Sequence, residues 1–165
     1  SGFRPDLSPG RGRLGGWDVQ FASGPPLPQA APARQRTWSL GVLTGVVTRQ
    51  TDATAAALRN DCGESVEVHL LRDTPLGVRL GEVLSESPSP QILVGEGEEW
   101  LARWGLLQEL RSRHPLVVDA DCPAELRTVA GERALAPYAR PGAGRAWLCA
   151  PAARPVRVEL RAVSR

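Results

Sequence analysis

The sequence contains no lysine and no methionine, and all twenty of its basic residues are arginine. Isoleucine, asparagine and tyrosine each occur once. Scarce lysine, isoleucine and asparagine beside abundant alanine, arginine, glycine and proline are typical of a GC-rich genome. Whatever its origin, the absence of lysine excludes a phosphate-binding loop that neutralises nucleotide phosphates with a lysine ammonium group.

Long apolar stretches are also absent. No apolar run approaches the roughly 20 residues needed to cross a bilayer, so the sequence predicts no membrane segment. Residues 1–4 contain no basic stretch followed by an apolar core, and no signal peptide is predicted. The missing initial methionine indicates a shortened chain.

Cysteine is scarce and its spacing is uninformative. Cys62, Cys122 and Cys149 lie far apart without a Cys-x-x-Cys pair, which argues against a disulfide framework and a structural zinc site. No metal site is predicted, and a reducing, cytoplasmic location is expected. His69 lies in an apolar alternation and His114 precedes a proline, so both are interpreted as structural or surface residues.

An excess of charge of one sign is missing too. The net charge is +2, and arginine alternates with acidic residues along the chain. Nucleic-acid binding needs several clustered cations that neutralise phosphates. The charge pattern therefore favours a solvated surface and makes nucleic acid an improbable partner.

Proline divides the chain. Residues 24–36 contain four prolines, which can neither continue a helix nor pair inside a sheet, and this span is predicted to be an extended linker. It separates a short β-hairpin tail, residues 1–23, from a main domain, residues 37–165.

The main domain alternates short apolar segments with amphipathic ones, which predicts an α/β fold with a mostly parallel sheet, flanking helices and a closing β-hairpin. Ligands in such sheets bind beyond the carboxyl ends of the strands. We expect strands over residues 38–44, 65–71, 91–95, 115–119, 145–149 and 155–163, and helices over 51–59, 98–113 and 123–129. Residues 72–90 are expected to be irregular.

A short sequence repeat occurs once near each end of the chain. Ser-Pro-Gly-Arg-Gly-Arg at residues 8–13 resembles Arg-Pro-Gly-Ala-Gly-Arg at residues 140–145. Each copy contains a Pro-Gly turn that leads into a predicted hairpin. A repeat spaced by about one domain length suggests that each copy is the last hairpin of a domain. On this interpretation residues 1–23 are the tail of a preceding domain, or a strand pair that docks onto the present one.

The first strand and helix of the main domain have the layout of a degenerate phosphate-binding loop. That loop requires a strand, the pattern Gly-x-x-x-x-Gly-Lys-Ser/Thr, and a helix. Gly45 takes the first glycine position and Arg49 lies inside the loop, but Gln50, Thr51 and Asp52 replace the second glycine, the lysine and the hydroxyl residue. Asp52 would place a carboxylate where phosphates belong, although it suits a helix N-terminus. The loop is therefore predicted to be inactive, with ATP and magnesium as cofactors only if it retains some binding.

Acidic residues follow two other predicted strands, as Glu96 and Glu98 after one and Asp119 and Asp121 after the next. Acids at strand ends commonly cap the following helix. An alternative is general acid–base chemistry in a small α/β enzyme that uses Asp119, Asp121 or Glu96. Cys122 follows Asp121 directly, but no paired serine, cysteine or histidine nucleophile supports this alternative, and no catalytic residue is assigned.

Several segments resemble the FtsK/SpoIIIE superfamily of ring-forming translocases, in its actinobacterial form that includes the EccC-type motor of type VII secretion. The resemblance is strongest over residues 91–148. It is carried by Ile-Leu-Val-Gly at 92–95, Trp-Gly-Leu-Leu at 104–107, Leu-Val-Val-Asp at 116–119, Ala-Glu-Leu-Arg-Thr at 124–128, Ala-Leu-Ala-Pro-Tyr at 134–138 and Pro-Gly-Ala-Gly-Arg at 141–145.

This resemblance implies a degenerate, RecA-like (P-loop-like) terminal ATPase domain inside a larger motor, without catalysis of its own. The implied role is assembly, regulation or substrate docking, with other ATPase domains of the same or neighbouring motor subunits as partners. The motor could be membrane-anchored, with this chain as part of its soluble portion. In the EccC-type branch such domains also receive secretion signals in an apolar pocket, which makes a substrate peptide a further candidate partner. Trp100, Trp104 and Trp147 are the candidates for lining that pocket.

Overall fold

The computed structural model describes residues 11–14, 17–20, 37–85, 88–133 and 135–163. The chain divides into two compact units, residues 1–34 and residues 35–165, each described by itself. In the first unit, strands β1 (Arg11–Leu14) and β2 (Trp17–Gln20) pair antiparallel as a hairpin. Residues 24–36 of the predicted linker lie outside the described residues.

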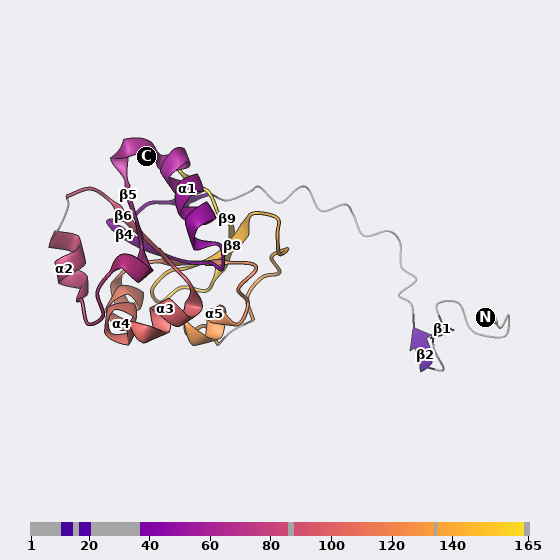
Figure 1. Cartoon of the computed structure of the whole chain (residues 1–165). Helices are drawn as coiled ribbons and strands as arrows, with labels where there is room; N and C mark the ends of the chain where they lie inside the picture. The colour runs from indigo at the N-terminus through magenta and orange to yellow at the C-terminus, as the bar shows by residue number, and fades with distance from the viewer. Residues whose placement is uncertain (1–10, 15–16, 21–36, 86–87, 134, 164–165) are drawn as a thin grey trace. The chain divides into compact units, whose positions relative to one another are not determined.

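The second unit has a mixed α/β fold, which confirms the predicted class (Figure 1). Its described residues form a six-stranded sheet in the order β5-β6-β4-β7-β8-β9. The first four are parallel and the last two are antiparallel to their neighbours. The strands are β4 (Leu43–Val47), β5 (Glu67–Leu70), β6 (Gln91–Gly95), β7 (Leu116–Asp119), β8 (Arg145–Cys149) and β9 (Val156–Glu159).

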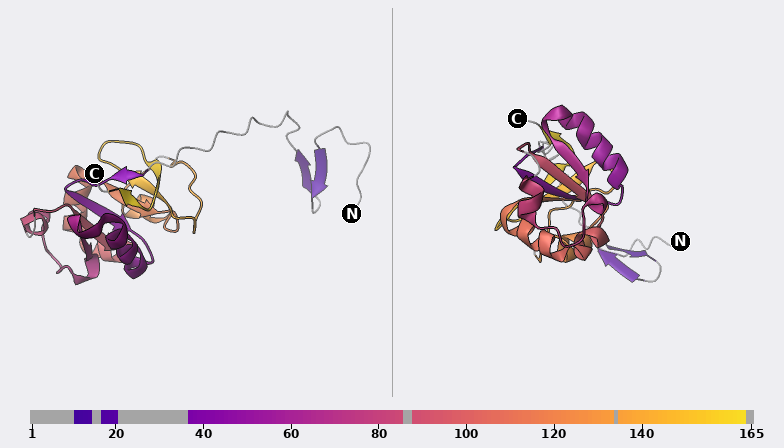
Figure 2. Two further views of the ribbon diagram at one scale, coloured as in Figure 1. Left: turned by 90° about the horizontal axis from the view of Figure 1, so that it is seen from above. Right: turned by 60° about the vertical axis from the view of Figure 1, so that its left-hand side comes forward.

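Helices cover both faces of this sheet (Figures 1 and 2). One face packs against α1 (Thr51–Cys62), which buries Ala55, Leu58 and Cys62 against strands β4 to β6. The other face carries α2 (Leu80–Ser85), α3 (Gly97–Ala102), α4 (Trp104–Arg113) and α5 (Glu125–Thr128). Two short 3₁₀ turns, η1 (Gly63–Ser65) and η2 (Leu71–Asp73), flank β5.

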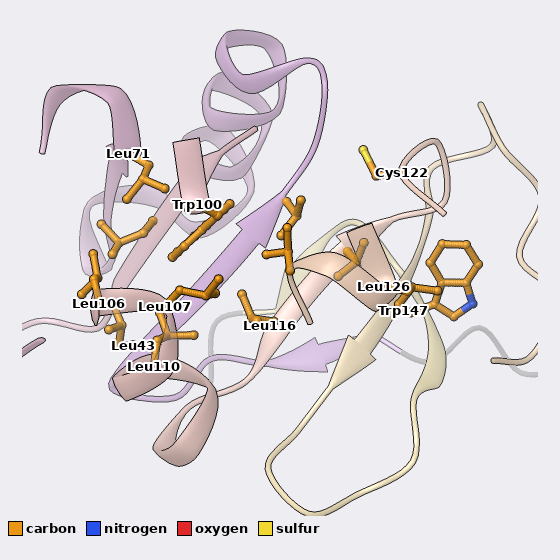
Figure 3. Close-up of a cluster of buried hydrophobic side chains, with 14 of the residues drawn as sticks. Leu43, Leu71, Trp100, Leu106, Leu107, Leu110, Leu116, Cys122, Leu126 and Trp147 are labelled. Atoms are coloured by element: carbon orange, nitrogen blue, oxygen red, sulfur yellow. The ribbon is translucent and has the colours of Figure 1, made fainter. Parts of the chain in front are cut away.

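The strands β4, β6 and β7 are buried along their whole length. This explains their continuous apolar sequence, because a central strand of a covered parallel sheet has no solvent-facing side. Figure 3 shows the larger core cluster, in which Trp100 lies among Leu43, Leu71 and Leu107.

Several predicted elements were wrong in their limits, including the strand expected over 155–163, which is two strands, β9 and β10 (Ala162–Val163). The strand expected over 38–44 is two strands: β3 (Trp38–Ser39), which pairs parallel with β10 (Ala162–Val163), and β4, which runs on to Val47. The irregular stretch 72–90 contains α2. The helix expected over 98–113 breaks at Arg103, whose backbone leaves the helical region and whose guanidinium donates to the carbonyl oxygen of Thr74 at 2.5 Å.

Candidate functional site

The parallel strands β4, β6 and β7 end side by side at Val47, Gly95 and Asp119, the sheet edge at which α/β proteins bind ligands. There the hydroxyl of Thr48 donates a 2.9 Å hydrogen bond to Asp119 Oδ2. Thr54 of α1 donates to Thr48 Oγ1 at 3.4 Å. Both threonines and Asp119 are buried. The first turn of α1 is therefore tied to the ends of two strands by a closed polar network.

The connection from β4 to α1 has only three residues, Thr48, Arg49 and Gln50. The backbone N–H of Gln50 donates to Thr48 Oγ1 at 3.2 Å, so one amide of this turn is already used inside the protein. A phosphate-binding loop instead needs a glycine-rich arch whose free amides surround the phosphates. Arg49 and Gln50 are exposed, whereas Thr51 is buried in the first turn of α1.

Gly45 does not belong to this turn, and its assignment to the first glycine of a phosphate loop is corrected. It lies inside β4, paired with Leu93 of β6 and Leu116 of β7. A β-carbon at Gly45 would lie 2.5 Å from Leu116 Cδ2 and 3.1 Å from the ring of Trp100. The glycine is needed because a core leucine and a core tryptophan pack directly on its backbone.

Asp52, in the first turn of α1, is paired with Arg72 of η2. Two guanidinium nitrogens of Arg72 donate to the two carboxylate oxygens at 2.5 and 3.1 Å. The hydrogen bond and charge of Arg72 lower the pKa of the exposed Asp52 carboxyl. A carboxylate of the protein itself therefore lies in the first turn of α1, near the helix N-terminus where an anion would bind.

The acidic pairs are also engaged in local structure. Glu96 and Glu99 form a reciprocal capping box at the start of α3, and Glu98 is exposed in the same turn. Asp119 Oδ1 accepts from the backbone N–H of Asp121 at 3.1 Å, and Asp121 Oδ1 accepts from that of Gly142 at 2.9 Å. Glu96 thus caps the following helix as the capping interpretation predicts, whereas Asp119 and Asp121 accept hydrogen bonds within loops rather than at the start of α5.

A groove of about 580 Å³ opens beside the first half of α1. One wall carries Gln50 and Thr54 with the small side chains of Ala53 and Ala57. The other wall carries the Ala143–Gly144 turn, which belongs to the second copy of the repeat, and residues 159–161. Sequence reasoning missed this groove, because its walls come from segments about ninety residues apart whose small residues carry no motif.

Two of the three tryptophans predicted to line a peptide pocket are buried in the core. Trp100 is completely buried and donates from Nε1 to the carbonyl oxygen of Val46 at 3.2 Å. Trp147 is 6% exposed and donates to the carbonyl oxygen of Pro137 at 2.7 Å. Trp104 is 53% exposed at the start of α4. Two of them are core residues with satisfied N–H groups, as buried tryptophans commonly are.

Burial shifts the pKa values of the three cysteine thiols and of His114. Desolvation raises the pKa of the Cys122 thiol to about 11 and that of Cys149 to about 12. It also raises the pKa of Cys62 and lowers that of His114. All three thiols are free. A nucleophilic cysteine needs a lowered pKa, so these groups are poorly suited to catalysis.

Within the described ranges, no cluster of three or more His, Cys, Asp or Glu side chains is arranged to hold a metal ion. The helices of the same ranges include none that combines the length and apolarity of a membrane span. Comparisons of the chain with protein-family models, curated proteins and solved structures find no match.

Proposed function

We propose that residues 37–165 form a non-catalytic, ATPase-like module of an FtsK/SpoIIIE-type translocase, which contributes assembly, regulation or substrate docking rather than hydrolysis. The RecA-like ancestry and the cytoplasmic location are parts of this proposal. The observation that carries it is the turn between β4 and α1. It occupies the place of a phosphate loop in a parallel sheet, but it has three residues and no lysine.

The contacts around this turn support the first part of the proposal, that the domain is not catalytic. Thr48 is committed to Asp119, and Asp52 is committed to Arg72. An incoming triphosphate would meet the carboxylate of Asp52 at the helix N-terminus without a lysine to offset the repulsion. Nucleotide phosphates are normally held by free backbone amides and a lysine, whereas here the Gln50 amide is already bonded to Thr48 Oγ1 and the cation of the turn is Arg49.

The two hairpins support the second part of the proposal, that this domain is one module of a larger motor. The second repeat copy leads into the β8–β9 hairpin, which extends the parallel sheet beyond β7. The first copy leads into the β1–β2 hairpin, which is also antiparallel. Because an isolated two-stranded hairpin is marginally stable in water, β1–β2 is expected to complete a sheet, either that of another ATPase domain or that of this one.

The first part is tested by calorimetric titration with MgATP and MgADP, beside an FtsK-type domain with an intact phosphate loop as the positive control. We expect no saturable heat up to millimolar nucleotide. Binding at low micromolar affinity that is lost in Gln50→Ala would overturn it.

The second part is tested with the complete gene product. Deleting residues 37–165 is expected to change its assembly state in native mass spectrometry or its ATP-hydrolysis rate. A complete product that neither assembles nor hydrolyses ATP, with or without these residues, contradicts the proposal. Peptide docking through the three tryptophans loses support because Trp100 and Trp147 are buried.

A further inference from the structure

Strand β9 is the last strand of the six-stranded sheet, at the end away from β5 (Figure 1). Its inner side pairs antiparallel with β8, and the N–H of Leu160 continues that ladder by donating to the carbonyl oxygen of Gly144 at 2.9 Å. Its outer side is paired with none of the described strands. The unpaired side of an edge strand is a template on which a further strand can add.

The register with β8 determines which backbone groups face outward. In an antiparallel pair, alternate residues exchange hydrogen bonds with the neighbouring strand, and the residues between them point away from it. Because Leu160 bonds to β8, Val158 and Val156 do so as well, and the N–H and C=O groups of Arg157 and Glu159 point outward. Val156 is 38% exposed and Arg157 is also exposed, so solvent reaches this stretch of the strand.

Two side chains of opposite charge accompany these outward groups. Arg157 and Glu159 lie on the same face of β9, since they are two residues apart in a strand. Arg157 donates from one guanidinium nitrogen to the carbonyl oxygen of Tyr138 at 3.3 Å. One carboxylate oxygen of Glu159 accepts from Arg145 of β8 at 3.1 Å, and the Glu159 side chain remains 22% exposed. Charges of one sign would repel a second copy of the strand, whereas this plus–minus pair complements its own antiparallel copy.

We propose that two copies of this chain associate through the outer edges of their β9 strands, around a two-fold axis at Val158. The antiparallel register centred there places Arg157 opposite Glu159 of the second copy, and the two-fold axis repeats the pair. Both residues point outward, so each exchanges its backbone hydrogen bonds with the residue opposite. On the other face of the strand, the exposed Val156 comes opposite Leu160 of the second copy.

The charges also select this register over its neighbours. Outward residues can pair only with outward residues, so the register changes in steps that move the axis by one residue. An axis at Arg157 sets the two arginines against each other, and an axis at Glu159 sets the two glutamates against each other. Like charges directly opposite each other are destabilising. The inference is independent of the translocase proposal, because it depends only on β9 and its register with β8.

Sedimentation velocity of the full chain over a range of concentrations measures the association. We expect a reversible equilibrium between the 17.7 kDa monomer and its dimer, with a dissociation constant that is roughly micromolar or weaker because the interface is small. Hydrogen exchange of ¹⁵N-labelled protein locates the surface. The amides of Arg157 and Glu159 should exchange more slowly as the concentration rises, whereas that of Val158, bonded to β8, should be protected at every concentration.

Two charge variants test the pairing. Arg157→Glu and Glu159→Arg each place like charges across the axis and should each weaken self-association by about tenfold or more. A mixture of the two variants restores opposite charges at both positions and should form a heterodimer. Arg133→Glu, the same charge change at an exposed residue outside β9, is the matched control and should leave association unchanged. Amide spectra check that each variant is folded.

Several results would overturn the proposal. They are a chain that stays monomeric up to about 1 mM, the weak end of measurable association, a dimer that both charge variants leave unchanged, and folded variants that do not associate when mixed. Protection of the Arg157 and Glu159 amides that does not depend on concentration would also overturn it, because the strand on β9 would then come from the same chain.

Discussion

The hydroxyl of Thr48 and the carboxylate of Asp119, 71 residues apart in sequence, are joined by a buried 2.9 Å hydrogen bond between the ends of β4 and β7. Thr48 also accepts from Thr54 Oγ1 and from the backbone N–H of Gln50. The network occupies the sheet edge where a ligand would be expected. Each of these hydrogen bonds is made between the protein's own groups.

Replacing Thr48 tests how much that network stabilises the fold. Thr48→Val keeps the side-chain shape but leaves the carboxylate of Asp119 without its side-chain donor. Leaving a buried acceptor unsatisfied costs about 1–3 kcal/mol, and urea denaturation should show a loss of that size. Thr48→Ser, which restores the hydroxyl, is the control and should recover most of the loss. Equal stability of the valine and serine variants would show that the hydrogen bond contributes nothing.

Gly45→Ala tests whether Gly45 is packed inside β4 rather than part of a phosphate-binding loop. In Gly45→Ala the new methyl group meets Leu116 Cδ2 at 2.5 Å, and overpacking of this kind costs about 1–3 kcal/mol. Gly105→Ala is the matched control, because a β-carbon there meets nothing within 4 Å and lies in α4. Alanine favours a helix over glycine by up to about 1 kcal/mol, so this variant should be slightly more stable. A neutral Gly45→Ala would indicate a flexible strand rather than a packed one.

The tryptophans predict a contrast in stability. Trp100→Ala should cost about 3–5 kcal/mol, because a fully buried aromatic side chain is removed from the core. Trp104→Ala should change the free energy of unfolding by less than about 1 kcal/mol, since more than half of the side chain is exposed. Chemical denaturation of both variants measures this difference. A loss at Trp104 as large as that at Trp100 would show that Trp104 is held by contacts absent from this structure.

The Asp52–Arg72 pair predicts an acid-dependent contribution to stability. The folded-state pKa of Asp52 lies below its ordinary value of 3.8, so its contribution is present above that value and is lost as the pH falls through the folded pKa. Arg72→Gln removes the pair but leaves Asp52 at the N-terminus of α1. We expect its melting temperature to be lower than wild type at pH 6 and to converge on it near pH ~2–3.

Salt provides the control for this pair, since both side chains are exposed. About 1 M sodium chloride should shrink the difference at pH 6, because the Debye length falls to roughly 3 Å. A difference that is independent of both pH and salt would mean that Arg72 acts through packing alone.

The sequence alone determined the α/β class, the limits of the buried strand β6 and of the closing strand β8, and the helix that follows the first long strand. These come from local signals: continuous apolar runs, an alanine-rich segment and the glycine that ends α1 at Gly63. It also determined, through the missing lysine, that ordinary phosphate-loop chemistry is excluded.

Only the tertiary structure decided where β4 ends, and with it the meaning of Gly45. The apolar pattern around this glycine fits a strand end equally well, and the choice depends on Trp100 and Leu116, which arrive from more than fifty residues away. The same holds for Arg103, where the helix expected over 98–113 is interrupted and whose side chain bonds to Thr74, 29 residues away in sequence. Packing and side-chain hydrogen bonds between distant segments carry no local periodicity. The groove that they form beside α1 therefore becomes visible only in three dimensions.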